Sequence, residues 1–325
     1  MSNNIIISIC IPIYNGEYTI EGTLKSILSD LSGNEDKVEI IISDNCSTDN
    51  TFNILSNYIK KYDFIKYFRN ESNLGFDRNI DKIINLASTD YVWFVGDDDE
   101  LEKGAVAKVL DTLKNFENLK SICINYSMYD RIKEKYTSDK VIGIDEDILF
   151  HSPNEFLSKL GYYPNFVSSL ILNKSNFKTD LYKKYYDTDW FHYFVLYDIL
   201  KDGKSYFISH PFIINKGYEA NGPNSANEGG VSVRVFLRLL NYIFNLDEKY
   251  YNASTKKYII SNSVFFLAKK VSSARRLGLT RNRDIVEEMY QLYKKNIYLY
   301  VLVLPIYLTP TFIHRLIYNI YKKTR

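Results

Sequence analysis

The sequence Tyr91-Val92-Trp93-Phe94-Val95-Gly96-Asp97-Asp98-Asp99-Glu100-Leu101 decides the fold of this chain. Its first five residues, rich in valine and aromatic side chains, are typical of a buried strand that Gly96 ends. In an open α/β sheet, ligands bind at the carboxyl ends of strands, where these aspartates would lie. Adjacent carboxylates repel one another, so a shared cation would offset the cost of folding them together. We therefore expect Asp97, Asp98 and Asp99 to bind Mg²⁺ or Mn²⁺, with substrate phosphates completing the shell; the alternative is a solvated acidic turn.

Strands and helices alternate in the hundred residues that end at this stretch. β-branched runs predict buried strands, and apolar residues at helical spacing predict the helices between them. This order predicts a parallel sheet with right-handed crossovers. No glycine-rich dinucleotide or P-loop motif follows the first strand. The expected strands are 5–13, 38–42, 64–68 and 91–95, and the expected helices are 17–31, 52–61 and 76–87.

The pattern changes after the aspartates and becomes helical from residue 231 onward. We expect an α/β domain over residues 1–220 and a helical C-terminal region over residues 221–325. The elements expected downstream are helix 105–116, strand 120–126, an insertion or hairpin at 127–148, helix 153–160, strand 166–172, a helix that opens at Asp187, strands 206–208 and 211–215, a Gly- and Asn-rich loop at 217–230, and helices 231–247, 254–276 and 283–296 before a terminal stretch.

The net charge of +2 conceals an acidic first third and a basic end. Residues 1–100 carry a balance of −9, whereas residues 251–325 carry +11. An acidic front suits cation binding, and a basic end suits an anionic surface. Three widely separated cysteines indicate neither a disulfide framework nor a structural zinc site. The first residues lack the basic region of a signal peptide, so we expect the protein in the cytoplasm.

Four short motifs follow one another in the first hundred residues. They are Pro12-Ile13-Tyr14-Asn15, Ile41-Ile42-Ser43-Asp44-Asn45-Cys46-Ser47-Thr48-Asp49-Asn50-Thr51, Asn73-Leu74-Gly75 with Asn79, and Phe94-Val95-Gly96-Asp97-Asp98-Asp99-Glu100-Leu101. In this order and spacing they resemble family 2 glycosyltransferases of the GT-A fold, also called the nucleotide-diphospho-sugar transferase fold. The resemblance covers residues 5–101 well and residues 102–215 loosely. It implies a Rossmann-like, mostly parallel α/β sheet flanked by helices, and metal-dependent transfer of a sugar from a nucleotide-diphosphate donor.

The resemblance also implies roles for individual residues in the donor site. Asp44 would accept a hydrogen bond from the imide N–H of the base, which favours a uridine- or thymidine-type donor. The structural alternatives are a turn proline, core packing of the tyrosine, and a helix cap for Asp44 or Asp49. Pro12, Tyr14 and Glu17 would line the nucleotide site, and Asn73 with Arg78 or Asn79 would close over the nucleotide-sugar.

The acidic motif departs from the usual family pattern, which is Asp-x-Asp followed by another Asp. Here Gly96 precedes three aspartates, so the register is ambiguous. If Asp97 and Asp99 form the pair, Asp99 is the direct metal ligand. If Gly96 replaces the first aspartate of the pattern, Asp98 takes that role.

The stretch Tyr186-Asp187-Thr188-Asp189-Trp190-Phe191-His192 resembles the acidic pair and tryptophan that precede a helix in inverting members of the family. The resemblance implies that Asp189 is the general base, with Asp187 as its competitor. The alternative is helix capping, because aspartate is favoured at a helix start. His192, or else His210, would be a further metal ligand, and Trp190 would stack on a sugar ring.

The C-terminal region combines basic residues at 268–283 with an apolar stretch at 297–313 that Pro305 and Pro310 interrupt. This stretch is short for a spanning helix, so we expect an interfacial segment beside a basic surface. The alternative is a core helix with a solvated basic tail. Nothing else in the chain supports nucleic-acid binding.

The resemblance extends to bacterial enzymes that build surface polysaccharides. It implies a glycan acceptor on a polyprenyl-diphosphate carrier and a location at the inner face of the cell membrane. The rival hypotheses are a non-catalytic sugar-nucleotide-binding or scaffold subunit, against which the acidic triplet and Asp189 argue, and a nucleotidyltransferase, which would need a glycine-rich loop. We expect donor and acceptor choice to lie in residues 127–165 and 217–230.

Overall fold

The computed structural model describes the chain except for residues 1–4, 32, 176, 217–227, 277–282 and 315–325. The chain divides into two compact units. The first unit is Met1–Phe156 with Tyr163–Tyr218, and the second is Leu157–Tyr162 with Glu219–Arg325. The predicted domain boundary at residue 220, and most of the predicted loop 217–230, lie outside the described residues.

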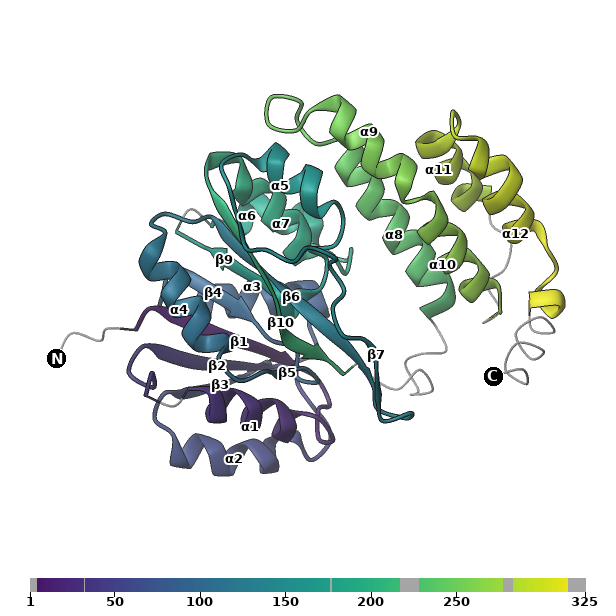
Figure 1. The fold of residues 1–325 in the computed structure, drawn as a ribbon. Coiled ribbons are helices and arrows are strands. Elements are labelled where there is room, and N and C mark those ends of the chain that lie inside the picture. The colour runs from purple at the N-terminus through teal and green to yellow at the C-terminus, as the bar shows by residue number, and fades with distance from the viewer. Residues whose placement is uncertain (1–4, 32, 176, 217–227, 277–282, 315–325) are drawn as a thin grey trace. The chain divides into compact units, whose positions relative to one another are not determined.

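The first unit is built on one ten-stranded sheet in the order β3-β2-β1-β4-β9-β6-β10-β5, with β7 paired to β6 and β8 paired to β10 (Figure 1). Strands β3, β2, β1 and β4 run parallel, as expected from the alternating pattern. β9 runs antiparallel to both of its neighbours, β4 and β6, so the sheet is mixed. The strands are β1 (Ile7–Ile13), β2 (Val38–Asp44), β3 (Ile65–Arg69), β4 (Tyr91–Phe94), β5 (Glu100–Leu101), β6 (Ser121–Asp130), β7 (Lys135–Ser138), β8 (Ile148–Phe150), β9 (Leu170–Asn173) and β10 (Ser205–Asn215).

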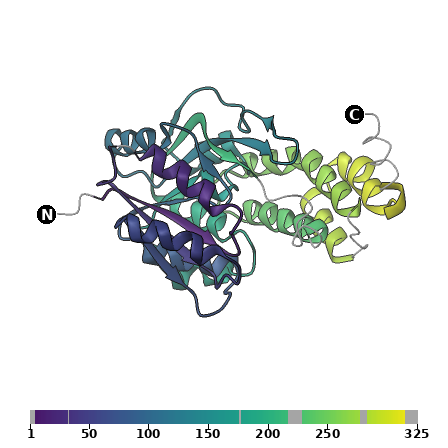
Figure 2. The same ribbon diagram turned by 90° about the horizontal axis from the view of Figure 1, so that it is seen from below.

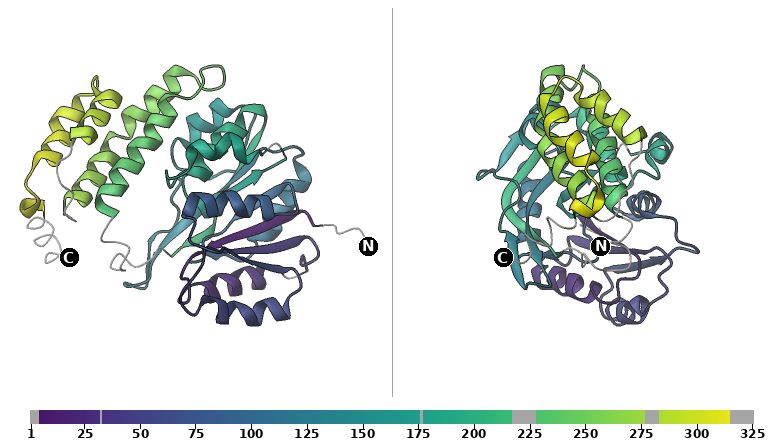
Figure 3. Two further views of the ribbon diagram at one scale, coloured as in Figure 1. Left: turned by 180° about the vertical axis from the view of Figure 1, so that it is seen from behind. Right: turned by 90° about the vertical axis from the view of Figure 1, so that its right-hand side faces the viewer.

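Helices cover both faces of this sheet. α1 and α2 contact each other and share one core with α4, whereas α3 packs on β1 and β2 from the opposite face and contacts α7. Figure 2 views the unit from the side of α1 and α2, and the left view of Figure 3 shows α3 in front of the sheet. The bounds of the helices are α1 (Ile20–Asp30), α2 (Thr51–Lys61), α3 (Phe76–Leu86), α4 (Ala105–Asn115), α5 (Pro153–Leu160), α6 (Thr179–Tyr182) and α7 (Phe191–Ile199), with 3₁₀ turns η1 (Val167–Ser169), η2 (Lys183–Tyr185) and η3 (Leu200–Asp202).

The central strands are buried along their whole length, which explains their unbroken apolar sequences. Alternate residues of β1 face the two layers of helices. Ile7, Ile9 and Ile11 belong to the core that α1 and α4 cover, whereas the thiol of Cys10 lies against the Ile83 carbonyl of α3. This double-sided burial fixes the strand ends that carry the site.

Several expected elements of the first unit differ from the structure. Residues 167–169 form the 3₁₀ turn η1 rather than the start of the strand expected at 166–172. The two strands expected at 206–208 and 211–215 form one strand, β10, whose register shifts between Ile208 and Ile213 around Pro211, which has no N–H to donate. The helix expected at 17–31 begins at Ile20. The helix expected to open at Asp187 begins only at Phe191, because a turn precedes it.

The second unit is helical, as expected, and its helices pack on one another. The helix expected at 254–276 is interrupted at Ser263, and α8 begins at Glu228, within the loop expected at 217–230. No helix within the described ranges is long and apolar enough to cross a membrane. The helices are α8 (Glu228–Phe244), α9 (Ala253–Asn262), α10 (Val264–Arg276), α11 (Arg283–Tyr293) and α12 (Leu304–Leu308), with a π-helical turn η5 (Leu299–Val303).

One residue of the expected basic surface is internal. Arg275 is only 4% exposed and donates to the Thr309 carbonyl, so it braces the helices instead of facing an anionic surface. Arg281, Arg315, Lys322, Lys323 and Arg325 lie outside the described residues.

Candidate functional site

The carboxyl ends of β1, β2 and β4 meet at one edge of the sheet. Ile13 pairs with Asp44, and the Val95 N–H donates to the Cys10 carbonyl, so the residues after each strand are neighbours. A pocket of about 470 Å³ opens at this edge, where ligands bind in sheets of this kind. Its lining comprises Pro12, Ile13, Tyr14, Asn45, Asn73, Gly75, Phe76, Asn79, Gly96, Asp97, Asp98, Asp99, Phe166, Val167 and Asn215.

The pocket brings together many of the residues expected to bind the donor or a metal. These are Pro12, Tyr14, Asn73, Asn79 and the three aspartates. Eight lining residues had no expected role. Phe76 adjoins one of the four motifs, whereas Phe166, Val167 and Asn215 come from distant elements whose placement depends on the topology of the sheet. The other four, Ile13, Asn45, Gly75 and Gly96, belong to the motifs themselves. The expected site residues outside the lining are Glu17, Asp44, Arg78, Asp187, Asp189, His192 and His210.

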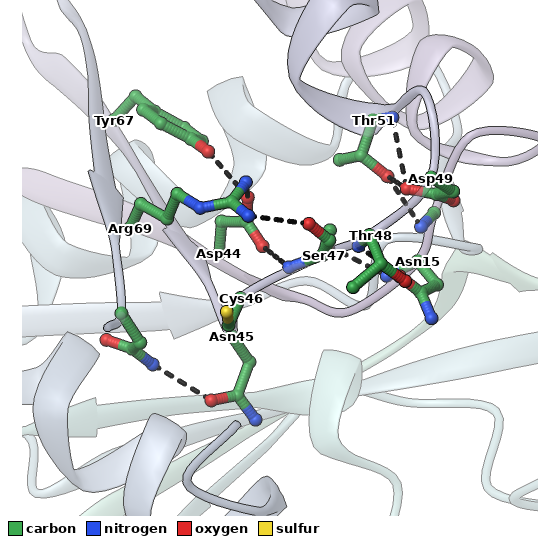
Figure 4. Close-up of polar contacts among 12 residues, drawn as sticks. Asn15, Asp44, Asn45, Cys46, Ser47, Thr48, Asp49, Thr51, Tyr67 and Arg69 are labelled. Carbon is green, nitrogen blue, oxygen red and sulfur yellow. Dashed lines mark hydrogen bonds and ion pairs between the residues drawn. The ribbon is translucent and has the colours of Figure 1, made fainter. Parts of the chain in front are cut away.

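Asp44, the expected contact to the base, ends β2 and is fully buried. Its Oδ1 accepts from the Ser47 N–H at 2.7 Å, and its Oδ2 accepts from the Tyr67 hydroxyl at 2.5 Å and the Arg69 guanidinium at 3.2 Å (Figure 4). A carboxylate with three donors is well satisfied without a ligand. In this structure the Asp44 carboxylate is held by Ser47, Tyr67 and Arg69.

The loop after β2 is fastened to the loop after β1. The Ser47 hydroxyl accepts from the Asn15 N–H at 2.9 Å, and the Asn15 side-chain oxygen accepts from the Thr48 N–H at 2.8 Å (Figure 4). The Asp49 carboxylate accepts from the Glu17 N–H at 3.0 Å, and the Glu17 carboxylate accepts from the Asn50 N–H at 3.0 Å. Glu17 and Asp49 thus hold the two loops together beside the pocket.

Asparagine side chains join these loops to the start of α3. The Asn45 amide donates to the Asn73 side chain at 2.8 Å, and the Leu74 N–H donates to Asn45 at 2.8 Å. Asn79, which is almost completely buried, donates to the Ser43 carbonyl and accepts from the Ser43 hydroxyl. The turn at 73–75 and the first turn of α3 are consequently fixed relative to β2.

Each aspartate of the acidic turn has its own environment. Oδ2 of Asp97 accepts from the Thr19 hydroxyl at 3.3 Å. Asp99 is 2% exposed, and its Oδ2 accepts from the Ser168 hydroxyl at 2.5 Å, while that hydroxyl also accepts from the Gly96 N–H. Asp98 lines the pocket, and its backbone carbonyl accepts from the Arg131 guanidinium at 2.7 Å. Asp99 therefore braces the turn from inside.

Burial makes negative charge costly in this turn. Burial, followed by the neighbouring charge of Asp98, raises the pKa of Asp97 to about 7. The same two causes raise the pKa of Asp99 well above its usual value. Burial also raises the pKa of Asp98, an effect that the Arg131 guanidinium opposes. A bound cation reverses such shifts, because it favours the ionised carboxylates.

The donor chemistry of this turn fits Mg²⁺ or Mn²⁺. Mg²⁺ and Mn²⁺ prefer oxygen ligands, and they are well suited to buried carboxylates whose negative charges repel one another. Among the residues that the structure describes, no group of three or more His, Cys, Asp or Glu side chains forms a ready-made metal site.

The segment expected to supply the general base lies in the turn before α7. Asp187 forms a bidentate ion pair with Arg78, with N–O distances of 2.5 Å and 3.0 Å, and this pairing lowers the pKa of Asp187. Arg78 thus contacts the base segment, whereas the resemblance implied a contact to the donor. Asp189 is exposed, and its φ of 61° is in the left-handed region.

The two candidate histidines lie apart from the pocket lining. His192 is 3% exposed, and its Nε2 lies 2.9 Å from the Asn165 carbonyl. Burial lowers the pKa of His192 to about 4. His210 contacts Glu102 at 3.2 Å. Neither histidine is grouped with the acidic turn, and a metal-binding role for either stays a prediction.

Comparisons with known proteins agree with this geometry. The family model described as "Glycosyl transferase family 2" matches residues 8–177. The chain is 29% identical over 249 residues to an abequosyltransferase of Salmonella typhimurium, a match that covers 73% of both chains. It is 30% identical over 146 residues to a putative teichuronic acid biosynthesis glycosyltransferase of Bacillus subtilis, covering 45% of this chain and 55% of that one.

Solved structures show the same fold. S. aureus TarS 1–349, solved in complex with UDP-GlcNAc, superposes with a TM-score of 0.63 at 16% identity. The match covers 93% of this chain and 89% of that chain. It confirms the expected α/β fold with a helical C-terminal region.

Proposed function

This chain belongs to glycosyl transferase family 2 and is a nucleotide-sugar glycosyltransferase, and on that premise we propose that it transfers the sugar of a UDP- or dTDP-type donor to a growing, lipid-linked surface glycan with inversion. The observation that carries the proposal is the pocket at the carboxyl ends of β1, β2 and β4. Residues at the end of β1 and the three aspartates of the acidic turn line this pocket, which has a volume of about 470 Å³. The uridine preference is supported by the resemblance of Asp44 and its neighbours to the family motif and by the UDP-GlcNAc complex of TarS.

Asp98 is the proposed principal ligand of the divalent cation, with Asp97 beside it. Asp99 is already engaged by Ser168 and is almost fully buried, which favours the register in which Gly96 replaces the first family aspartate. When bound, the cation supplies positive charge that neutralises the departing nucleoside diphosphate. The aspartates of the acidic turn, which line the pocket, would hold this cation.

Asp189 is the proposed general base. The bond between the anomeric carbon and the phosphate oxygen breaks, and the leaving diphosphate keeps the electron pair. The acceptor oxygen bonds to the anomeric carbon while its proton passes to the Asp189 carboxylate. Asp187 is the weaker candidate, because its ion pair with Arg78 stabilises the carboxylate and lowers its affinity for a proton.

The proposed acceptor is carried by a lipid, and the second unit supplies support. A groove of about 890 Å³ lies among α8, α9 and α11. Its lining includes Phe244, Ile260 and Leu292 together with three lysines, Lys257, Lys294 and Lys295, and contains no carboxylate. Ile297, which also lines the groove, and Val301 are exposed apolar side chains. An apolar floor beside positive charge suits an anionic lipid surface.

The experiment that tests the donor site is calorimetric titration with UDP, GDP, CDP and dTDP, each with and without Mn²⁺. We expect Mn²⁺-dependent binding of UDP or dTDP. Asp98→Asn should remove the dependence on Mn²⁺, because it removes the ligand charge. Asp99→Asn should weaken binding less and lower the melting temperature, because Asp99 braces the turn.

Two outcomes would contradict the proposal. If the folded protein binds none of the four nucleotides, either alone or with lipid vesicles present, the donor-site assignment fails. If Asp99→Asn abolishes the Mn²⁺ dependence and Asp98→Asn preserves it, the register is the other one.

A further inference from the structure

The first turn of α3 contains Asp77, a residue to which the family motifs assign no role. We propose that Asp77 is the positioning residue that holds the general base in place, and that this turn joins the base to the donor pocket. The inference rests on the proposed function, because it takes Asp189 to be the base. Asp77 itself lies outside the pocket lining, so its action is through Asp189.

The carboxylate of Asp77 gathers the backbone that precedes α7. Its Oδ2 accepts from the N–H groups of Thr188 at 2.7 Å and Asp189 at 3.0 Å, and its Oδ1 accepts from the Phe191 N–H at 3.2 Å. Asp77 is 3% exposed, so water competes little for these bonds. The N–H groups at a helix start have no partners in the helix, and the partial positive charge there favours a carboxylate. A side chain from α3 thereby caps α7.

The backbone that Asp77 holds is strained. Asp187 has a φ of 62° and Asp189 a φ of 61°, which residues with a β-carbon seldom adopt. Such conformations cost on the order of 1 kcal/mol each and persist only where their surroundings enforce them. Asp77 enforces this conformation because its carboxylate accepts from the backbone N–H groups of residues 188, 189 and 191, which include and flank Asp189. Without these bonds the turn would relax, and the Asp189 carboxylate would leave its position.

The same turn of α3 also reaches the donor pocket. Phe76 and Asn79 line the pocket, while Asp77 and Arg78 bind the base segment. Arg78 pairs with Asp187 and lies 4.7 Å from the ring centroid of Tyr186. Four consecutive residues therefore contact both halves of the site. A sugar-nucleotide donor that contacts Phe76 or Asn79 would therefore stabilise the turn of α3 that positions the general base.

The test compares Asp77→Ala, Asp77→Asn and Asp189→Asn with a matched control, Asp81→Asn. Asp81 is a buried carboxylate one turn further along α3, and it accepts from the Tyr186 hydroxyl at 2.9 Å instead of from the amides of 188–191. Turnover is measured with UDP- and dTDP-sugars as nucleoside-diphosphate release with water as the acceptor. Nucleotide affinity is measured by calorimetry, and hydrogen exchange is followed in a peptide that covers residues 186–191.

We expect Asp77→Ala to lower kcat by about 10- to 100-fold, the loss that a small misplacement of a catalytic group produces. Nucleotide affinity should stay within about twofold, because the pocket lining is intact, and exchange at 186–191 should accelerate. The kcat of Asp77→Asn should fall between those of the wild type and Asp77→Ala. The amide oxygen of asparagine can still accept hydrogen bonds from the backbone, whereas its nitrogen cannot. Asp81→Asn should keep kcat near that of the wild type.

Each remaining outcome decides the inference. Wild-type kcat and exchange in Asp77→Ala, with Asp189→Asn inactive, would overturn the positioning role and leave the base assignment standing. Full activity of Asp189→Asn would overturn the proposed base itself. If Asp77→Ala does not fold, the folded Asp77→Asn and Asp77→Glu variants decide. Wild-type kcat in both contradicts the inference, and lowered kcat with unchanged nucleotide affinity supports it.

Discussion

At the scale of single residues, the burial of His192 has a consequence for the stability of the folded chain. Its Nε2 faces the Asn165 carbonyl, and its Nδ1 is buried with no hydrogen-bond partner in the structure, so this ring is held neutral. It packs edge-on against Phe76, which lines the donor pocket. The residue thus contributes to the wall behind the pocket in its uncharged form.

This environment predicts a pH dependence of stability. The pKa of His192 is about 4 in the folded chain, against 6.5 for an unperturbed histidine. Between these values the unfolded chain binds a proton at His192 that the folded chain does not, so stability is lost as the pH falls from about 6.5 toward 4. The slope from this residue approaches about 1.4 kcal/mol per pH unit.

The measurement is urea unfolding of the wild type and His192→Gln at pH 7, 6 and 5. Glutamine cannot titrate, and its amide can still donate to the Asn165 carbonyl. We expect the difference in unfolding free energy between the two proteins to shift in favour of the variant as the pH is lowered. A difference that stays constant across this range would show that His192 is not the titrating group.

At the scale of elements, the N-terminus of α4 is capped by a side chain from another helix, α1. Gly104, at its N-cap, has no side chain and a φ of 94°. The carboxylate of Asp30, the last residue of α1, accepts from the N–H groups of Gly104 and Val106. α4 follows the acidic turn after the short strand β5, so Asp30 also anchors the chain that leaves the site.

We predict that Asp30→Ala destabilises the first unit by about 1–2 kcal/mol, the usual cost of a lost N-cap. For a unit of this size the melting temperature should fall by ~2–4 °C per kcal/mol. Ser29→Ala is the matched control, because Ser29 is the exposed neighbour of Asp30 and its hydroxyl donates to the Ser26 carbonyl in its own helix. Equal melting temperatures of the Asp30 and Ser29 variants in a calorimetric scan would refute the cap.

Long-range bonds of this kind explain which elements the sequence could predict. Buried runs such as β1 and β2 follow from their apolar residues alone, because burial on both faces leaves a local signature. The late start of α7 does not, because its cap is Asp77, more than a hundred residues earlier. The break between α9 and α10 likewise depends on Ser263, whose hydroxyl contacts the Ile260 carbonyl and the Tyr293 hydroxyl of α11.

The candidate site divides in the same way. Residues in short motifs at strand ends, such as Pro12 and Asp98, line the pocket as expected because parallel strands end at one edge. Phe166 and Asn215 line it because β9 and β10 were inserted into that sheet, which no local pattern shows. Asp44 had the expected location, but its three hydrogen-bond partners could only be seen in the fold.

At the scale of the whole molecule, the charge asymmetry of the chain separates into two functions. The acidic first unit holds the proposed cation site, and the second unit presents Lys257, Lys294 and Lys295 around an apolar groove that no carboxylate lines. We predict that the full chain co-sediments with vesicles containing phosphatidylglycerol, and that replacing these three lysines with alanine lowers the partition coefficient about 100-fold. This estimate takes about 1 kcal/mol for each lysine near an anionic surface. Replacing Lys60, Lys114 and Lys135, which are exposed on the first unit, removes the same net charge and should have little effect.

Binding of the wild type to these vesicles should also weaken as the salt concentration is raised, because the attraction is screened. Equal loss in the two triple variants would mean that net charge alone attracts the protein to the vesicles, and equal binding to purely phosphatidylcholine vesicles would exclude an electrostatic role for the groove.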